Sequence, residues 1–359
     1  MTLPSAASTT GMKGGGFYDA HSEYQQRVIL AGEAGIRHAV ATLALDGIGG
    51  ALTIADYGAG TGATSVLAVH AAIRAIRERG VTRPIVAVHN DLPTSDFSSL
   101  FGFAAAPGGY LAEPGPIYST AAAGSFFGQV VADGSVHLGL CSNAAHWFRE
   151  QPDVGPVDGM YFSAATGKAG ERLAAEAAED WCRFLGIRAA ELAPGGQLLV
   201  QGIATDGSRV SAAGLLDQMW RVCRDLVHEE LLDSETLAHY VFPVYCRSEE
   251  EVAAPLEPGG ALATRLTLVS SKLEEVPNPY WEQFERDGDA QAYARTYSDF
   301  VRAFSEANLT RDLFSPGARG IEPGQLCTEF FDRFEQVTGA RPDAGRYRAY
   351  VMSSVFLRR

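Results

Sequence analysis

The chain has 359 residues, of which 46% are hydrophobic and 20% are charged, as is usual for a globular protein. Its 29 Lys and Arg stand against 43 Asp and Glu, which gives a formal net charge of −14. This acidic balance argues against nucleic-acid binding, whose affinity comes from clustered Lys and Arg. No apolar run is long enough to cross a bilayer, so we expect no membrane partner.

The first ten residues, MTLPSAASTT, predict a disordered tail. They lack the charged and then apolar segments of a secretory signal, so we do not expect such a signal there. The five cysteines form no CxxC pair, and the eight histidines form no HxH or HxxxH pair. This pattern is typical of the reducing cytoplasm and favours neither a disulfide framework nor a metal site. We therefore expect a cytoplasmic protein without a bound metal.

Helical and strand patterns alternate over the first part of the chain. Apolar residues at helical spacing predict helices at 24–45 and 62–79. Apolar runs predict buried strands at 52–58, 84–93, 135–143 and 192–204. Strands that alternate with helices indicate an α/β fold, in which helices cover both faces of a mostly parallel, Rossmann-like sheet.

After about residue 206 the pattern changes. Residues 213–233 and 290–309 predict amphipathic helices, and residues 263–276 and 347–359 predict two further strands. We expect a helical cap inserted into a core that comprises residues 11–206 and 260–359. The cap would consist of residues 207–259 with part of 278–325, and it would cover the carboxyl ends of the strands, where open α/β sheets bind ligands.

The segment TIADYGAGTG places Asp56 two residues before Gly58, with Gly60 following. Gly58-x-Gly60-x-x-Ala63 matches the dinucleotide fingerprint, and the same glycines behind an acidic residue match the loop of S-adenosylmethionine binders. A pyrophosphate is disfavoured by a nearby carboxylate, whereas the ammonium and sulfonium groups of S-adenosylmethionine favour one. Asp56 therefore favours the methyl donor, and a tight turn without a ligand is the remaining alternative.

Asp91 ends the second strand, in the segment HNDLP. A carboxylate at this point can accept hydrogen bonds from both hydroxyls of a ribose, in NAD sites and in methyl-donor sites. Taken alone, Asp91 is explained equally well as the cap of the following turn. Together with the glycine loop, it favours a nucleoside-containing cofactor, and the cofactor that we predict is S-adenosylmethionine.

Four segments in this order resemble one family: GMKGGGFYDAHSEYQQRVI, IADYGAGTGATS, NDLPTSDFSSLF and AAGSFFGQVVADGSVHLGLCSNAAHWFREQP. The family is the SABATH methyltransferases, which transfer methyl from S-adenosylmethionine to small carboxylic acids and in some members to a ring nitrogen. The match runs from about residue 11 to 203 and more loosely to the end. The resemblance implies a class I methyltransferase sheet with a helical cap, and it implies a homodimer, which family members often form.

The resemblance also implies roles for individual residues. The cofactor would be bound by Tyr18, Ser22, Asp56, Gly58, Gly60, Asp91, Leu92, Ser125, Phe126 and Ser142. The substrate would be bound by Lys13, Gln25, Asn143, His146, Trp147, Leu215 and Leu216. The catalytic group would be Gln25, Trp147 and His146: the first two would hydrogen-bond the substrate carboxylate, and His146 would line the same pocket.

Several departures separate this sequence from the plant members of the family. Cys141-Ser142-Asn143 stands where plant members usually have Ser-Ser-Tyr, so an amide replaces an aromatic ring. Phe17 replaces Ser, His21 replaces Asn, and Thr64 stands near a family Asn that helps to bind the cofactor. The general description of the family therefore transfers, whereas its substrate preferences do not.

The predicted reaction is displacement at a methyl carbon by a carboxylate oxygen. A carboxylic acid has a pKa of about 4 in water, so it is already ionised at pH 7 and needs no general base. The enzyme would align oxygen, methyl carbon and sulfur away from water, which supplies roughly 7–11 kcal/mol. Apolar residues on the predicted helix at 213–233 favour an apolar acid, namely Leu215, Leu216, Met219 and Trp220.

Two other functions stay open at this point. An NAD-dependent oxidoreductase would use the same glycine loop, although Asp56 and the lack of a recognisable Tyr-x-x-x-Lys pair weigh against it. A protein that binds the cofactor without turnover is the other alternative, and the presence of both Gln25 and Trp147 argues against it.

Overall fold

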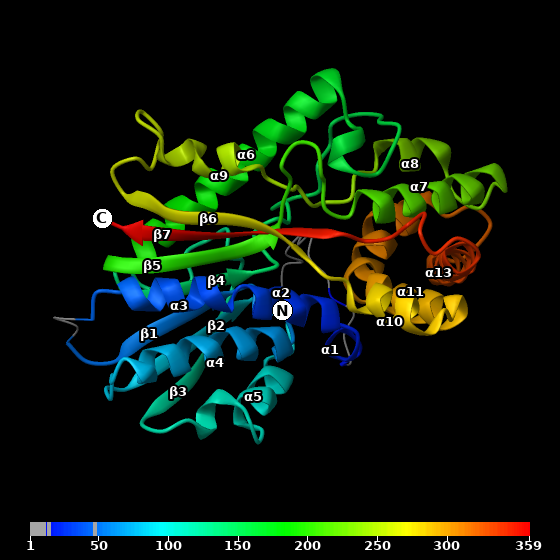
Figure 1. Ribbon diagram of the computed structural model, residues 1–359. Helices are drawn as coiled ribbons and strands as arrows, with labels where there is room; N and C mark the ends of the chain where they lie inside the picture. The colour runs from blue at the N-terminus through cyan, green and yellow to red at the C-terminus, as the bar shows by residue number, and fades with distance from the viewer. Residues whose placement is uncertain (1–11, 13–15, 46–48) are drawn as a thin grey trace, which may run out of the picture.

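A sheet with helices on both faces makes up one part of the molecule, and a group of helices lies beyond one end of its strands (Figure 1). The computed structural model describes residues 12, 16–45 and 49–359. The expected tail at residues 1–10 and Lys13 lie outside these ranges. Within them, no helix combines the length and the apolar character that crossing a membrane requires.

The sheet has seven strands in the order β3-β2-β1-β4-β5-β7-β6. Strands β1 to β5 run parallel to one another, whereas β7 is antiparallel to both of its neighbours, β5 and β6. The strands are β1 Leu52–Tyr57, β2 Ile85–Asp91, β3 Ile117–Ala123, β4 Val136–Ser142, β5 Leu192–Ile203, β6 Leu266–Val276 and β7 Ala349–Arg358. The predicted α/β class and mostly parallel sheet are confirmed, and the loops that follow β1, β2 and β4 meet at one edge.

Strand β3 was not predicted from the sequence. It reads IYSTAAA and forms the outer edge of the sheet, where its residues are half-buried or exposed. An edge strand rich in Ala shows neither a continuous apolar run nor a clear alternation, so the pattern on which strand prediction rests is missing.

The helical structure predicted for residues 24–45 is confirmed over most of that range, although it is divided into two helices. The segment forms α2 (Glu23–Ala31) and α3 (Glu33–Thr42), with Gly32 between them, and α1 (Phe17–Ala20) precedes them. Gly32 packs against β5, since a Cβ atom on it would lie 1.4 Å from the side-chain nitrogen of Gln201. A larger residue at position 32 would require the Gln201 side chain to move.

The two faces of the sheet carry separate apolar cores. Helices α2, α3 and α4 (Ala63–Glu78) cover the core that includes Leu199, and α6 (Gly167–Glu191) covers the core that includes Leu198 and Val200. Successive strand residues point to opposite faces, so one buried strand supplies both cores. The short helix α5 (Phe97–Ala105) packs against α4 and β3.

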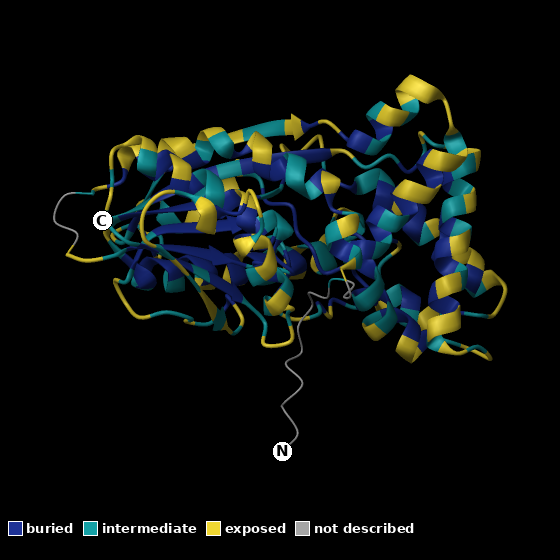
Figure 2. Cartoon of the chain, turned by 90° about the horizontal axis from the view of Figure 1, so that it is seen from below, coloured by how far each residue is buried: buried dark blue, intermediate teal, exposed yellow. Residues whose placement is uncertain are grey.

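The helices beyond the end of the strands share a third core, which is rich in aromatic side chains. They are α7 Ala213–His228, α8 Ser234–His239, α10 Pro279–Asp287, α11 Ala290–Asn308, α12 Ser315–Gly317 and α13 Pro323–Ala340. In Figure 2 their inward faces are buried and their outward faces are exposed. The amphipathic helices predicted at 213–233 and 290–309 correspond to α7 and α11. Each of them buries its apolar face against the other helices of the cap.

The expected limits of the cap stay a prediction. Two elements bear on them: α9 (Glu249–Ala253) lies within the expected range but packs its Val252 against the core of the sheet. Helix α13 lies beyond the expected range and packs against α11 and α7.

A buried ion pair at the end of α6 connects this helix to the loop between β3 and β4. Arg188 and Glu191 are fully buried, and Arg188 Nε lies 2.8 Å from Glu191 Oε2. The guanidinium also donates to the carbonyls of Phe126 and Gly128, at 2.8 and 2.9 Å. Glu191 accepts hydrogen bonds from the Tyr57 hydroxyl at 2.8 Å and from the backbone N–H of Val130 at 2.7 Å. The pair thereby fixes residues 126–130 against the end of β1.

Replacing Arg188 with Met should destabilise the protein by about 3–5 kcal/mol, because Glu191 would stay buried without its counter-charge. Chemical denaturation measures this loss. The double variant Arg188→Met with Glu191→Met should recover part of it, since both charges are then gone. A double variant no more stable than the single one would contradict the assignment. As a control, Arg37→Met removes the exposed Arg37–Glu78 pair and should leave the midpoint nearly unchanged.

Candidate active site

The glycine loop lies between β1 and α4, and two of its glycines have different surroundings. Both have left-handed backbones, with φ of 83° at Gly58 and 59° at Gly60. A Cβ atom on Gly58 would lie 2.4 Å from the Cβ atom of Ala144, in the loop after β4. A Cβ atom on Gly60 would meet nothing within 4 Å. Gly58 is therefore required for packing, whereas Gly60 leaves open space in which a ligand can approach the backbone.

The carboxylate of Asp91 connects this loop to the one that follows β2. Its Oδ2 atom accepts from the N–H of Gly60 at 2.6 Å, and its Oδ1 atom accepts from Leu92 N–H at 2.7 Å and from Ser95 Oγ at 2.5 Å. These bonds use three of the roughly four acceptor positions of a carboxylate. Asp91 can therefore accept one ribose hydroxyl directly, and a second only if one of these bonds is exchanged.

Asp56 is the buried acid at the end of β1. It is 3% exposed, and its side chain accepts a hydrogen bond from Ser65 on α4. Burial, together with repulsion from Asp91, raises the pKa of Asp56 to about 7, although the Ser65 bond lowers it. The carboxylate is therefore only partly ionised at neutral pH, and a cationic ligand beside it would favour the charged form.

Helix α1 contacts the glycine loop from the other side. Thr61 donates a hydrogen bond to Asp19 Oδ1 at 2.7 Å. Next to Asp19, Tyr18 is buried. Ser22 is fully buried, and its hydroxyl donates to the carbonyl of Asp19 at 3.2 Å. The sequence prediction missed Asp19, because an acid in a short helix is not distinctive until its partner in the loop is known.

The remaining residues predicted for the cofactor surround the loop less uniformly. Phe126 is buried, and its ring carbon Cε1 would lie 3.6 Å from a Cβ atom on Gly58. Leu92 is half-buried and Ser125 is exposed. Ser142 is half-buried and donates to Gln201 Oε1 at 3.2 Å. Phe126 is thus placed directly over the loop, and Ser125 precedes it at the surface.

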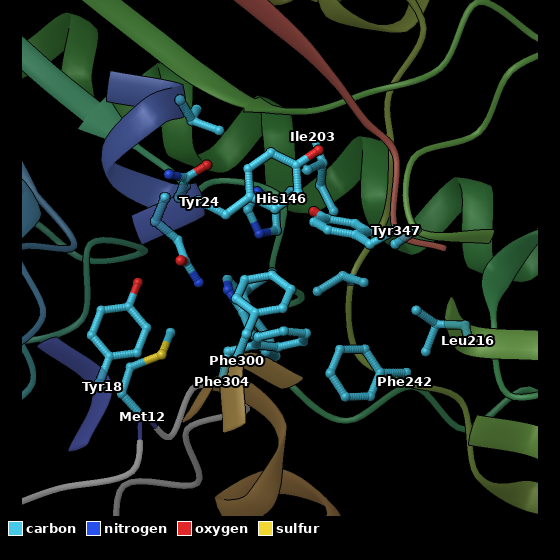
Figure 3. Close-up of a pocket in the computed structure, with 16 residues that line it drawn as sticks. Met12, Tyr18, Tyr24, His146, Ile203, Leu216, Phe242, Phe300, Phe304 and Tyr347 are labelled. Atoms are coloured by element: carbon cyan, nitrogen blue, oxygen red, sulfur yellow. The ribbon is translucent and has the colours of Figure 1, made fainter. Parts of the chain in front are cut away.

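A cavity lies next to this loop, and its walls are largely aromatic (Figure 3). It encloses about 630 Å³, part of which is open to solvent. The predicted site residues that line it are Tyr18, Gln25, Asn143, His146, Trp147 and Leu216. The segment after β4 borders both the cavity and the glycine loop. Its Asn143 and Trp147 line the cavity, and Ala144 between them packs against Gly58 of the loop.

Two residues predicted for the substrate pocket lie elsewhere. Leu215 is fully buried in the aromatic core of the cap and does not contribute to the cavity wall among the described residues. Lys13 falls outside the described residues. Met219 also lies in the core of the cap, so Leu216 is the part of α7's apolar face that reaches the cavity, together with Ala212 just before the helix.

Several wall residues were missed by sequence reasoning. They come from elements far apart in the chain: Tyr24, Ile203, Phe242, Phe300, Phe304 and Tyr347. Figure 3 shows Phe300 and Phe304, one turn apart on α11, side by side along one wall. Their helical spacing signals an apolar face, but it cannot distinguish a cavity wall from the core.

Three buried polar atoms around the cavity have no hydrogen-bond partner within the described ranges. They are Gln25 Oε1, Asn143 Nδ2 and His146 Nδ1. Leaving such an atom unpaired costs about 1–3 kcal/mol. Asn143 is also held with φ at 56°, a conformation that Asn tolerates better than most residues. A ligand with hydrogen-bonding groups would satisfy these atoms.

His146 is neutral in this site. Burial, and then the nearby guanidinium of Arg247, lowers the pKa of His146 to about 3. Among the described residues that line the cavity there is no Lys or Arg. The described groups that face an anion here are therefore neutral. No group of three or more His, Cys, Asp or Glu in the described part of the chain is arranged to hold a metal ion.

Comparison with known proteins agrees with this geometry. The model of the SAM dependent carboxyl methyltransferase family matches residues 7–359. Gibberellic acid methyltransferase 2 of Arabidopsis thaliana is 24% identical over 79% of this chain and 76% of its own length. Probable caffeine synthase MTL2 of Coffea canephora is 26% identical over 98% of this chain and 97% of its own length. The structure of loganic acid methyltransferase with SAH matches this chain with a TM-score of 0.78 and 21% sequence identity. The match covers 97% of this chain and 99% of that chain, so the two share a fold.

Replacing Gly60 with Ala should weaken binding of S-adenosylhomocysteine more than tenfold, because the added methyl group would enter the space above the loop. Alanine in the left-handed backbone conformation of this position should also lower the free energy of unfolding by about 1–2 kcal/mol. Gly134→Ala is a matched control: Gly134 also has positive φ, at 64°, with nothing within 4 Å of its Cβ position. Isothermal titration and thermal unfolding should show equal destabilisation but unchanged binding in the control. Equal binding losses in both variants would contradict the role of Gly60.

Proposed function

Because the chain belongs to the S-adenosylmethionine-dependent carboxyl methyltransferases, the SABATH family, we propose that it methylates the carboxylate of a small, largely apolar acid and releases a methyl ester. The cofactor of this family is S-adenosylmethionine, and the comparisons give no support to the NAD-dependent oxidoreductase alternative. The observation that carries the proposal is an apolar cavity next to the glycine loop, without a described Lys or Arg in its wall, in which the unpaired Asn143 Nδ2 can donate to a carboxylate.

The loop residues fit the cofactor. The open space at Gly60 admits the ligand, Asp91 keeps acceptor capacity for a ribose hydroxyl, and Asp56 places a carboxylate near a cation. When bound, S-adenosylmethionine supplies an electrophilic methyl carbon. We propose the same cofactor contacts for Tyr18, Ser22, Leu92, Ser125, Phe126 and Ser142 as the family resemblance implies.

Neutral donors suit the acid for a physical reason. We propose that Trp147, through its indole N–H, and Gln25, through its amide, orient the carboxylate, since both side chains can donate hydrogen bonds. A bidentate Arg would pair with the carboxylate more strongly and would lower the nucleophilicity of the attacking oxygen. Asn143 Nδ2 is a third donor at the same cavity. The apolar walls exclude water, which strengthens attraction between the anion and the cationic cofactor.

A carboxylate acceptor is favoured over a ring nitrogen, which must lose a proton. His146 is the titratable imidazole of the cavity, and its pKa of about 3 makes it too weak a base to hold that proton at neutral pH. We therefore propose that His146 is a neutral hydrogen-bonding wall rather than an acid or a base.

Two expectations from the sequence are kept as proposals. The five cysteines are free and four of them are buried, which supports a reducing compartment such as the cytoplasm. A homodimer without a nucleic-acid partner is proposed from the family resemblance and the acidic net charge.

A panel of acids tests the acceptor. Benzoate-like, indole-acetate-like, fatty and isoprenoid acids, with xanthine as a nitrogen acceptor, are incubated with enzyme and S-adenosylmethionine, and mass spectrometry detects the products. We expect a methyl ester from at least one acid. Binding of S-adenosylhomocysteine without any methylated product would favour a protein that binds the cofactor without turnover. Methylation of xanthine alone would exclude the carboxylate.

Replacing Trp147 with Phe keeps the aromatic ring and removes the indole N–H. The KM for the acid should rise about tenfold to a hundredfold, because a hydrogen bond to a charged group is worth about 1.5–3 kcal/mol. The Kd of S-adenosylhomocysteine should stay within twofold. Trp281→Phe is the control, since Trp281 donates to Glu285 on α10 and lies outside the described cavity wall. Equal effects on acid and cofactor would show that Trp147 does not face the acid.

Binding of S-adenosylhomocysteine should weaken as the pH falls through about 7, the pKa of Asp56. The ammonium group of this ligand favours the ionised carboxylate, which is lost as Asp56 takes up a proton. Between pH 8 and pH 6 the Kd should therefore rise about tenfold. Titration calorimetry measures it. Asp56→Asn should bind weakly at every pH, and a flat profile in the unchanged protein would contradict the role of Asp56.

A further inference from the structure

A continuous line of hydrogen bonds runs from Asp56 across the sheet to its outer edge. Ser65 Oγ donates to Asp56 and lies 2.8 Å from His89 Nδ1. His89 Nε2 lies 2.8 Å from the hydroxyl of Tyr110, in the short helix η1 (Tyr110–Ala112). The Tyr110 hydroxyl lies 2.6 Å from Ser119 Oγ on the edge strand β3. We call this set the Ser119–Asp56 line.

The line is buried except at its outer end. His89 and Tyr110 are fully buried, Ser65 is 5% exposed, and Ser119 is half-buried at the sheet edge. None of these four residues lines the cavity described above. Buried polar side chains are costly unless each is paired, so a function that needs the line would explain why this apolar layer contains a histidine and a tyrosine.

Counting hydrogens fixes the direction of every bond. An ionised Asp56 only accepts, so Ser65 must donate its single hydrogen to it. The Ser65 oxygen then accepts from Nδ1–H of His89, whose bare Nε2 accepts from Tyr110. Tyr110 in turn accepts from Ser119. When Asp56 is protonated and donates to Ser65, every bond reverses, and His89 carries its hydrogen on Nε2 instead. An ionised Asp56 thus requires the Nδ1–H tautomer of His89, whereas a protonated Asp56 also permits the Nε2–H tautomer.

We propose that His89 and Tyr110 are positioning residues that stabilise Asp56 as a carboxylate for the cationic cofactor. Aligned hydrogen bonds polarise one another, and a bond to a charged acceptor is stronger than a neutral one. The line therefore acts on cofactor affinity and leaves the acid cavity unaffected. The proposal rests on the cofactor site of the proposed function, which it extends.

Other titratable groups near Asp56 do not replace the line. The carboxylate of Asp91, on β2, repels the charge on Asp56 and raises its pKa. The thiol of Cys141, on β4, has its pKa raised to about 12 by burial and then by Asp56, so it stays protonated. Burial lowers the pKa of His89 to about 4, so the ring is neutral at the pH of binding. A neutral ring can act only through its tautomer.

The first experiment uses the unchanged protein. Nitrogen NMR of ¹⁵N-histidine-labelled protein, assigned with a His89→Gln variant, reports which nitrogen of His89 carries the hydrogen. We expect Nδ1–H in the complex with S-adenosylhomocysteine at pH 8 and Nε2–H in the free protein at pH 6. The same tautomer in both states would overturn the proposal.

The second experiment cuts the line. Tyr110→Phe should raise the pH midpoint of S-adenosylhomocysteine binding by about half a pH unit, roughly a threefold weaker Kd below the midpoint. The kcat at saturating cofactor should not change. Tyr293→Phe is the matched control, because Tyr293 on α11 has a hydroxyl without a hydrogen bond in the described structure. An unchanged midpoint in Tyr110→Phe would overturn the proposal, whereas failure of the unchanged protein to bind S-adenosylhomocysteine at any pH would overturn the cofactor site itself.

Discussion

The buried pair of Arg188 and Glu191 is the interaction on which the cofactor side of the molecule depends. Each charge is compensated by the other and by groups of the neighbouring chain, since Arg188 binds the carbonyls of Phe126 and Gly128 and Glu191 binds the Tyr57 hydroxyl. The loop after β3 is therefore held against the end of β1. A charged pair can remain buried only when every partner is in place, so the position of the Phe126 ring over the glycine loop is tightly determined.

The site that results has two electrostatically different halves. Carboxylates surround the glycine loop, with Asp91 bonded to Gly60 and Asp19 bonded to Thr61. The acid cavity beside it has neutral polar atoms and aromatic walls among its described residues. A cation is favoured in the first half, and an anion is not repelled in the second. The segment around Ala144 joins both halves, so under the proposed function the two ligands would meet where β1 and β4 end.

The sequence predicted the cofactor half better than the acid half. The glycine loop, Asp56 and Asp91 are local patterns, and the structure brings them together at adjacent strand ends. Leu215 and Leu216 show the opposite case: both lie in the core of the cap, but Leu216 also lines the cavity, whereas Leu215 does not. The distinction depends on which side of α7 faces the cavity, and no property of either leucine encodes it. The preference for glycine at position 32 also comes from outside the helix, since the Gln201 side chain on β5 occupies the space of a Cβ atom there.

The sequence by itself determined the fold class and most of the strands, because hydrophobic period acts over a few residues. It indicated the cofactor through Asp56 and the family resemblance, since the glycine spacing alone fits two cofactors. Only the tertiary structure decided which side chains line the cavity, which amides stay unpaired, and how His89 and Tyr110 reach Asp56. These features join residues from strands, loops and helices that are distant along the chain. Their distances and burial, which fix pKa values and hydrogen-bond direction, exist only once the sheet and the cap have packed together.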